Sequence, residues 1–329
     1  MKKRAWVFGA ICLVLAALAL SGCAEGEDLV SRGMGYYREG NYEQAMTCWE
    51  DAAAEGNAGA MYNIGTLYYS GEGVKQDYQA ALDWFLRGAE GGSESAMRYA
   101  ARLSYFDYEG LEKDYEQAAK WFGALAEKDD ADAMHWLGEI YEYYLEDVAA
   151  HDAIAREWYE RGASLGNSGC MYHMGKLYVE GKSVEKSEAT AFVWYERAAQ
   201  HGSRNAMREA GHMLCKGQGV KKDYPAAQSW LQKAVDAGDT EKGSYEWLGY
   251  LYASDLEGVE TDYEKGAAYY RQAEEAGSGY AMCMLGNMYK DGKLGETDLD
   301  MAREYYQKAL EAGYERAEDS LKALDEAEK

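Results

Sequence analysis

A sequence motif recurs along the chain about every 37 residues, and this period constrains the fold more than any other feature. A helix-centre glycine, replaced once by alanine, keeps this interval at Gly65, Ala101, Gly138, Gly175, Gly211, Gly249 and Gly286. An aromatic series keeps the same interval at Trp84, Trp121, Trp158, Trp194, Trp230, Tyr269 and Tyr305. Repeats of this size are typical of solenoids, because one repeat can bury its apolar face only against its neighbours. The period therefore predicts an extended stack rather than one globular core.

Each repeat is predicted to be a pair of antiparallel helices. Residues 60–70 place Met61, Ile64 and Tyr68 on one face at helical spacing, and residues 77–90 carry a second apolar stripe. Seven residues before each aromatic stand residues that suit a helix N-cap, at Asp77, Asp114, Ser187, Asp223, Asp262 and Asp298, with His151 at the remaining position. We expect the second helix of each repeat to start at these residues.

The array is predicted to cover residues 29–314. Its first repeat, residues 29–56, is shorter than the others and lacks the long loop between its helices. Residues 315–329 have an apolar side and many charges, which indicates a C-terminal capping helix that shields the last repeat. The sequence therefore predicts an all-α protein of about eight helix-pair repeats.

The second repeat carries a motif that resembles a known family. Residues 60–68 read Ala-Met-Tyr-Asn-Ile-Gly-Thr-Leu-Tyr, and Gly-Glu-Gly-Val at 71–74 precedes Asp77 and Trp84. This pattern resembles the Sel-one-like repeat, a longer-looped relative of the tetratricopeptide repeat. The resemblance implies a right-handed α/α superhelix that serves as an adaptor or scaffold, and it implies no particular reaction. Ala101 and the loops at 106–112 and 142–150 depart from the pattern.

The N-terminus is predicted to be a lipoprotein signal peptide. Three basic residues precede a 16-residue apolar stretch, which is shorter than the roughly 20 residues that cross a bilayer. Leu-Ser-Gly-Cys at 20–23 resembles the lipobox of bacterial lipoproteins, which implies cleavage of residues 1–22 and lipidation of Cys23. Residues 23–28 would form an acidic spacer. The alternative is an ordinary cleaved signal in which Cys23 is incidental.

This N-terminus predicts an extracytoplasmic protein of the cell envelope that is attached to the membrane only through its lipid. The lipid would lie in the outer membrane or on the periplasmic face of a diderm, or on the outer face of the plasma membrane of a monoderm. Four further cysteines, Cys48, Cys170, Cys215 and Cys283, match no zinc spacing and occupy different predicted helices. We expect buried free thiols, although an oxidising envelope permits a disulfide.

The charge balance excludes several functions. The chain has 58 acidic and 34 basic side chains and a net charge of −24, which opposes nucleic-acid binding because that depends on excess Lys and Arg. The five histidines show no H-E-x-x-H spacing, and the glycines recur with the repeat instead of forming a phosphate-binding loop. We therefore expect no catalytic residue, no metal site and no cofactor.

A partner is expected in the concave groove that the first helices of such a superhelix line. The positions three before and one after the helix glycine share one face there. The nominated groove residues are Tyr62, Arg98, Arg102, His135, Tyr172, Lys176, Arg208 and His212. Their excess of positive charge favours a protein or peptide ligand, with an acidic segment as one candidate. Alternatively, the arginines pair with neighbouring acids or reach solvent.

Function is less constrained than fold. The leading hypothesis is a non-enzymatic adaptor or scaffold that binds a protein or peptide. The alternatives are an architectural spacer of the envelope, which would use its ends rather than its groove, and a cell-wall-related enzyme.

Overall fold

The computed structural model describes residues 28–145 and 148–327, and these fold into helices and connecting loops without a strand. The protein is thus the all-α repeat solenoid that the period predicts. It divides into two compact units, residues 1–165 and 166–329. The predicted signal peptide, the lipidation site Cys23 and most of the acidic spacer lie outside the described residues. None of the described helices is long and apolar enough to span a bilayer.

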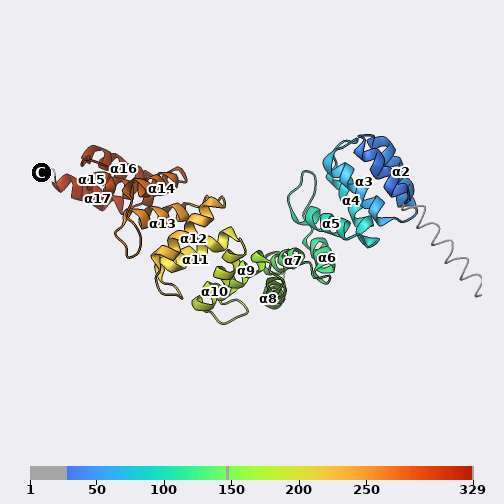
Figure 1. Ribbon diagram of the computed structural model, residues 1–329, viewed down its shortest axis with the longest axis horizontal. Helices are drawn as coiled ribbons and strands as arrows, with labels where there is room; N and C mark the ends of the chain where they lie inside the picture. Colours follow the sequence, from blue (N-terminus) through green and yellow to red (C-terminus); the bar gives the residue numbers. More distant parts are fainter. Residues whose placement is uncertain (1–27, 146–147, 328–329) are drawn as a thin grey trace, which may run out of the picture. The chain divides into compact units, whose positions relative to one another are not determined.

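Unit 1 contains four helix pairs (Figure 1). The first helix of each pair is called an A helix and the second a B helix. The helices in chain order are residues 28–38, α2 (Tyr42–Ala54), α3 (Ala58–Ser70), α4 (Tyr78–Glu90), α5 (Glu94–Tyr105), α6 (Tyr115–Ala126), α7 (Ala131–Tyr143) and α8 (Val148–Ser164). Each helix from α2 onward packs against the next, so the core continues from one repeat to its neighbour.

Unit 2 also contains four pairs and ends with a single helix. The helices are α9 (Ser168–Glu180), α10 (Glu188–Gln200), α11 (Arg204–Lys216), α12 (Tyr224–Asp236), α13 (Lys242–Ala253), α14 (Tyr263–Glu275), α15 (Gly279–Lys290), α16 (Leu299–Glu311) and α17 (Ala317–Ala327). Ala317 and Leu324 of α17 are buried in a cluster with Cys283 and Tyr306, so α17 packs on the last repeat.

Side-chain caps set the starts of the B helices. Asp77 precedes α4, and its carboxylate accepts a hydrogen bond from the Ala80 N–H at 2.9 Å. The same contact to the third residue of the helix recurs at Asp114, Ser187, Asp223, Asp262 and Asp298. The prediction at His151 is wrong, because α8 already begins at Val148 and His151 lies within its first turns. An imidazole lacks the short carbonyl or hydroxyl acceptor that defines these caps.

The helix-centre glycines allow a B-helix ring to pack against the A-helix backbone. A Cβ added to Gly65 would lie 2.6 Å from Cε1 of Phe85, and one on Gly249 would lie 2.6 Å from Cδ1 of Tyr270. The partner ring is therefore the residue after the recurring tryptophan or tyrosine. Trp84 itself is only partly buried, packs against the cluster formed by α2 and α3, and has the Arg87 guanidinium 4.0 Å from its ring centroid.

The second glycine of the Gly-x-Gly-Val loop joins consecutive repeats. Gly219 has φ +65°, and an added Cβ would lie 2.2 Å from the carbonyl carbon of Glu188 at the start of α10. A Cβ added to Gly73 would likewise lie 2.2 Å from Cβ of Tyr42, the first residue of α2. Ser183 occupies the same position with φ +51°, a conformation that is costly for a residue with a Cβ. The loop thus rests on the preceding B helix.

The four remaining cysteines are buried free thiols in four different helices, α2, α9, α11 and α15. The burial agrees with the expected packing role.

Candidate partner-binding surface

Two nominated arginines line a hollow on the A helices of unit 1. The hollow measures about 190 Å³ and is lined by Arg98, Arg102, Phe106, Phe122, Asp132, Ala133 and Trp136. Arg102 is exposed, and its Cζ lies 6.0 Å from the Phe106 ring centroid. Within the described part of unit 1, no carboxylate lies at ion-pair distance from Arg102. Its charge is therefore available to a ligand.

The positions three before the helix glycine join neighbouring repeats instead of facing a ligand freely. Arg98 Nη1 lies 2.6 Å from Oδ2 of Asp130, the N-cap of the next A helix. In unit 2, Glu246 accepts a hydrogen bond from Ser278, which is also the next N-cap, at 2.5 Å. Arg98 is therefore paired with an acid of the next repeat, as the alternative hypothesis proposed, although 43 % of its side chain remains exposed.

Arg208 makes the most buried of these contacts. Its Nη1 lies 3.0 Å from Oδ1 of Asp239, whose side chain is 2 % exposed, and Ser244 donates to the other carboxylate oxygen at 2.5 Å. The nearby acids Asp239 and Glu209 raise the pKa of the Arg208 guanidinium despite burial, which acts in the opposite direction. Arg208 is thus part of the repeat interface, so a partner can contact only its exposed edge.

The other nominated residues of unit 1 are engaged in packing or lie near an acid. Tyr62 packs its ring against Phe85 and Tyr99, with centroid distances of 5.9 and 5.7 Å. Burial raises the pKa of the Tyr62 hydroxyl. The His135 Nε2 lies 4.0 Å from Oε1 of Glu139.

In unit 2, Tyr172 packs against Tyr195 at a centroid distance of 5.6 Å, and Lys176 is partly exposed one turn further along α9. Burial, together with the charges of Lys216 and Arg208, lowers the pKa of His212 to about 4, so the ring is neutral at pH 7. The nominated groove residues are therefore divided between the two units. Helices α9 and α11 of unit 2 carry Tyr172, Lys176, Arg208 and His212. The A helices of unit 1 carry Tyr62, Arg98, Arg102 and His135.

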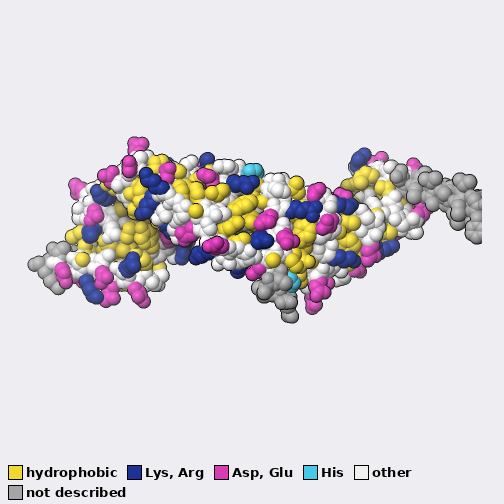
Figure 2. All heavy atoms as spheres, turned by 90° about the horizontal axis from the view of Figure 1, so that it is seen from below, with side chains coloured by type: hydrophobic (Ala, Val, Ile, Leu, Met, Phe, Trp, Pro, Cys, Tyr) yellow, Lys and Arg dark blue, Asp and Glu magenta, His cyan; other side chains and the backbone are white. Residues whose placement is uncertain are grey.

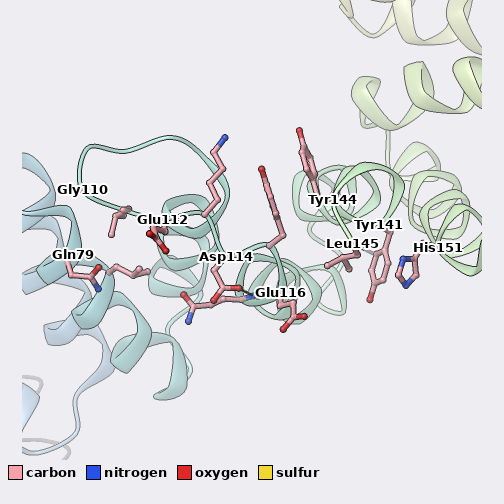
Figure 3. A pocket seen from close by; sticks show the side chains of 14 residues that line it. Gln79, Gly110, Glu112, Asp114, Glu116, Tyr141, Tyr144, Leu145 and His151 are labelled. Atoms are coloured by element: carbon pink, nitrogen blue, oxygen red, sulfur yellow. Dashed lines mark hydrogen bonds between the residues drawn. The ribbon is translucent and has the colours of Figure 1, made fainter. Parts of the chain in front are cut away.

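Unit 1 also has a larger cleft, which the sequence did not predict (Figure 3). It measures about 1140 Å³ and lies among the loop before α6, the start of α4 and the facing ends of α7 and α8. Tyr115 and Tyr144 stack there with centroids 4.2 Å apart, and Glu112 and Glu116 give the lining acidic character. The signal in the sequence was the departure of the loops at 106–112 and 142–150 from the repeat pattern, since both contribute lining residues.

Positive and negative side chains are interspersed on the face in Figure 2, so a local excess of one sign depends on how individual side chains are paired. Exposed lysines such as Lys128 and Lys308 have carboxylates within 2.6 and 2.8 Å. Such exposed pairs contribute little to stability, yet they neutralise charge that would attract a ligand.

Comparison with known families agrees with the repeat structure. The Sel1 repeat matches residues 18–57, 58–93, 94–130, 131–167, 168–203, 204–239, 244–278 and 279–314. The chain belongs to the Sel1 repeat family. The eight predicted repeats are thereby confirmed. Sel1 repeats generally serve as scaffolds or adaptors for protein interaction.

Two solved structures from bacteria have the same fold. The protective antigen c5321 of uropathogenic Escherichia coli, described as displaying an SLR fold, is 28 % identical with a TM-score of 0.79. The match covers 94 % of this chain and 66 % of the antigen, so slightly under two thirds of that protein is represented. A Sel1 repeat protein from Oxalobacter formigenes is 25 % identical with a TM-score of 0.69, over 95 % of this chain and 90 % of the other.

A short stretch also resembles HRD3A of Arabidopsis thaliana, a component of an ERAD-associated E3 ubiquitin-protein ligase. The two share 39 % identity over 59 residues, which is 18 % of this chain and 9 % of HRD3A. The chain spans only this small part of the plant protein.

Proposed function

We propose that this Sel1 repeat protein is a non-enzymatic, lipid-anchored adaptor on the extracytoplasmic side of a bacterial membrane. It would hold a protein or peptide partner on the surface of its A helices. The supporting observation is the hollow in unit 1, where the guanidinium of Arg102, which neighbours the Tyr108 hydroxyl but has no carboxylate at ion-pair distance among the described residues, lies beside Phe106 and Trp136. Arginine beside rigid aromatic rings is a combination that is enriched where proteins bind one another.

The binding proposal predicts that Arg102→Glu will abolish most partner capture. The full chain would be purified from membranes of the cells that produce it, and the proteins retained with it would be quantified by mass spectrometry. Charge reversal should remove at least about nine tenths of a specific partner, because an unfavourable charge replaces a favourable one. Arg38→Glu is the matched control, since Arg38 is also exposed and lies in unit 1 but outside the hollow. Equal capture by both variants would contradict the proposal.

Crosslinking separates the adaptor from the architectural spacer. A photoreactive side chain at position 102 should form a discrete adduct with another protein, whereas one at exposed Asp83 on B helix α4 should not. Adducts between copies of this chain, formed from its ends and not from position 102, would instead favour the spacer.

The anchor is tested by Cys23→Ala. If Cys23 carries the lipid, the wild-type chain should sediment with membranes and the variant should accumulate unprocessed or in the soluble fraction, because several acyl chains supply the membrane affinity. Cys48→Ala, which changes a buried thiol in α2, is the control and should leave the distribution unchanged. Metabolic labelling with a fatty acid that marks the Cys23→Ala chain as strongly as wild type would refute lipidation at this position.

A further inference from the structure

A second cleft lies on the A helices of unit 2, beyond the nominated residues. It measures about 540 Å³, a size suited to one or two side chains of a peptide. Its lining combines aromatic rings with two lysines and consists of Cys215, Lys216, Lys222, Tyr224, Glu246, Trp247, Tyr250 and Tyr280. These residues come from α11, the loop after it, and α12, α13 and α15.

The turn after α11 brings the two lysines together. Gly217 ends α11 with φ +74°, and the chain then passes through residues 218–223 to the start of α12. The Lys222 side chain returns over Gly217, where an added Cβ would lie 3.0 Å from its Cγ. Lys216 precedes this glycine, and its Nζ lies 6.0 Å from the Trp247 ring centroid. Both lysines therefore belong to one end of the cleft.

Neither lysine is neutralised by an acid. Within the described residues of unit 2, no carboxylate lies within ion-pair distance of Lys216 or Lys222, and both side chains are exposed. Other lysines of the unit have such partners, for example Lys290 with Asp291 and Lys322 with Glu318. In a chain with 58 acidic residues, two adjacent unpaired lysines form a local positive site.

The groups around the lysines do not supply the missing negative charge. Burial raises the pKa of the Cys215 thiol to about 12, against the opposing effect of Lys216 and Lys222, so the sulfur stays protonated at pH 7. His212 is neutral, as shown above. Glu246 is the only acid in the lining; it is not at ion-pair distance from either lysine, and one of its oxygens is held by the hydrogen bond from Ser278.

The remaining walls suit an apolar side chain. Trp247 and Tyr250 meet edge to face with centroids 5.7 Å apart, and Tyr280 and Tyr224 complete the aromatic lining. Aromatic walls bury large areas at little entropic cost, whereas lysines bind carboxylates as point charges. The ligand that matches both features carries a carboxylate next to an apolar group.

We propose that this cleft binds an acidic peptide segment of a partner protein, with a Glu or Asp carboxylate at Lys216 and Lys222 and a neighbouring apolar side chain against Trp247. The inference rests on the proposed adaptor function and specifies the chemistry of the partner. A nucleic acid would also bring negative charge, but it carries one charge per nucleotide, so a net charge of −24 opposes it more strongly than a segment with a few carboxylates, and the peptide is favoured.

Fluorescence polarisation with a defined probe tests the inference. The probe is a fluorescein-labelled octapeptide that alternates phenylalanine with glutamate and has an amidated C-terminus, so all carboxylates of the peptide itself are on side chains, and the glutamine peptide with the same label controls for the charge of the dye. The full chain should bind it, and Lys216→Glu/Lys222→Glu should weaken binding by about tenfold or more. Binding by the wild-type chain should also weaken between about 50 mM and about 500 mM salt, because exposed charges are screened.

A charge-matched control is available in the same region. Lys221→Glu/Lys242→Glu changes the net charge equally at two exposed residues outside the cleft lining, and should keep affinity within about twofold. Urea unfolding of both double variants checks that the fold is retained. The same peptide with glutamine in place of glutamate should bind at least about tenfold more weakly than the acidic one.

Three results would overturn the inference: no binding of the acidic peptide, equal binding of the glutamine peptide, or equal weakening by the two double variants. Displacement of the peptide by a single-stranded oligonucleotide at lower concentration than by unlabelled peptide would overturn the ligand class. The peptide assay requires no cellular partner. Its failure therefore leaves the Arg102 capture experiment to decide the adaptor function, and failure of that capture leaves the peptide result standing.

Discussion

Gly219→Ala is expected to lower the free energy of unfolding by roughly 3 kcal/mol or more, through two effects that act together. The residue has φ +65°, which costs about 1–2 kcal/mol once a Cβ is present. That Cβ would also lie 2.2 Å from the Glu188 carbonyl carbon and 2.5 Å from the Ala189 nitrogen. These are backbone atoms at the start of α10 that cannot rotate away, so the loop must move off the preceding repeat.

Gly202→Ala is the control that separates the backbone strain of a positive φ from the steric contact of the added Cβ. Gly202 has φ +89°, yet nothing lies within 4 Å of an added Cβ. Its replacement should cost only the backbone strain, about 1–2 kcal/mol. Urea unfolding of both variants, followed by far-UV circular dichroism, measures the difference. Equal midpoints would mean that the close approach of Gly219 to α10 does not contribute to stability.

Arg208→Ala should lower the free energy of unfolding by about 3–5 kcal/mol, because it leaves the Asp239 carboxylate buried without its cation. The Arg208 and Asp239 side chains are only 16 % and 2 % exposed. Arg102→Ala is the natural comparison, since Arg102 was nominated by the same sequence rule but is exposed. Its replacement should change stability by no more than about 0.5 kcal/mol.

A double variant shows whether the buried charge is the cause. Arg208→Ala/Asp239→Ala should be more stable than Arg208→Ala alone, because it removes the unpaired carboxylate as well. Chemical denaturation of the three chains provides the measurement, and a double variant that is less stable than the single would contradict this explanation. Arg102 is accordingly the better position for testing partner binding, since changes at Arg208 also disturb the repeat interface.

Local rules predicted the helix pairs well because the relevant contacts are close in sequence. An N-cap such as Asp77 bonds to an N–H three residues away, so the residue type alone indicates where a helix starts. The prediction failed at His151, where the repeat pattern continues but a histidine cannot accept the capping hydrogen bond. Helix α8 starts three residues earlier. The caps of the A helices, for example Asn57 before α3, follow the same chemistry and were missed.

Neighbour contacts between repeats were harder to predict. Arg98 and Arg208 occupy equivalent positions in their repeats, and both reach acids near the start of the next A helix. The periodicity identified their shared face but not these partners, because a cap or loop residue about 31 positions away becomes a neighbour only after the repeats stack. Lys216 and Lys222 were missed for a different reason, because they lie outside the positions that the period selected and come together through the local turn at Gly217.

The period and its apolar stripes by themselves determined an all-α stack of eight helix pairs. A helical hairpin with one apolar face can bury that face only by packing on neighbouring hairpins. Only the tertiary structure decided which charged side chains stay available. Arg208 is neutralised by a buried carboxylate, whereas Arg102, Lys216 and Lys222 are not, since pairing depends on which side chains of adjacent repeats come within bonding distance.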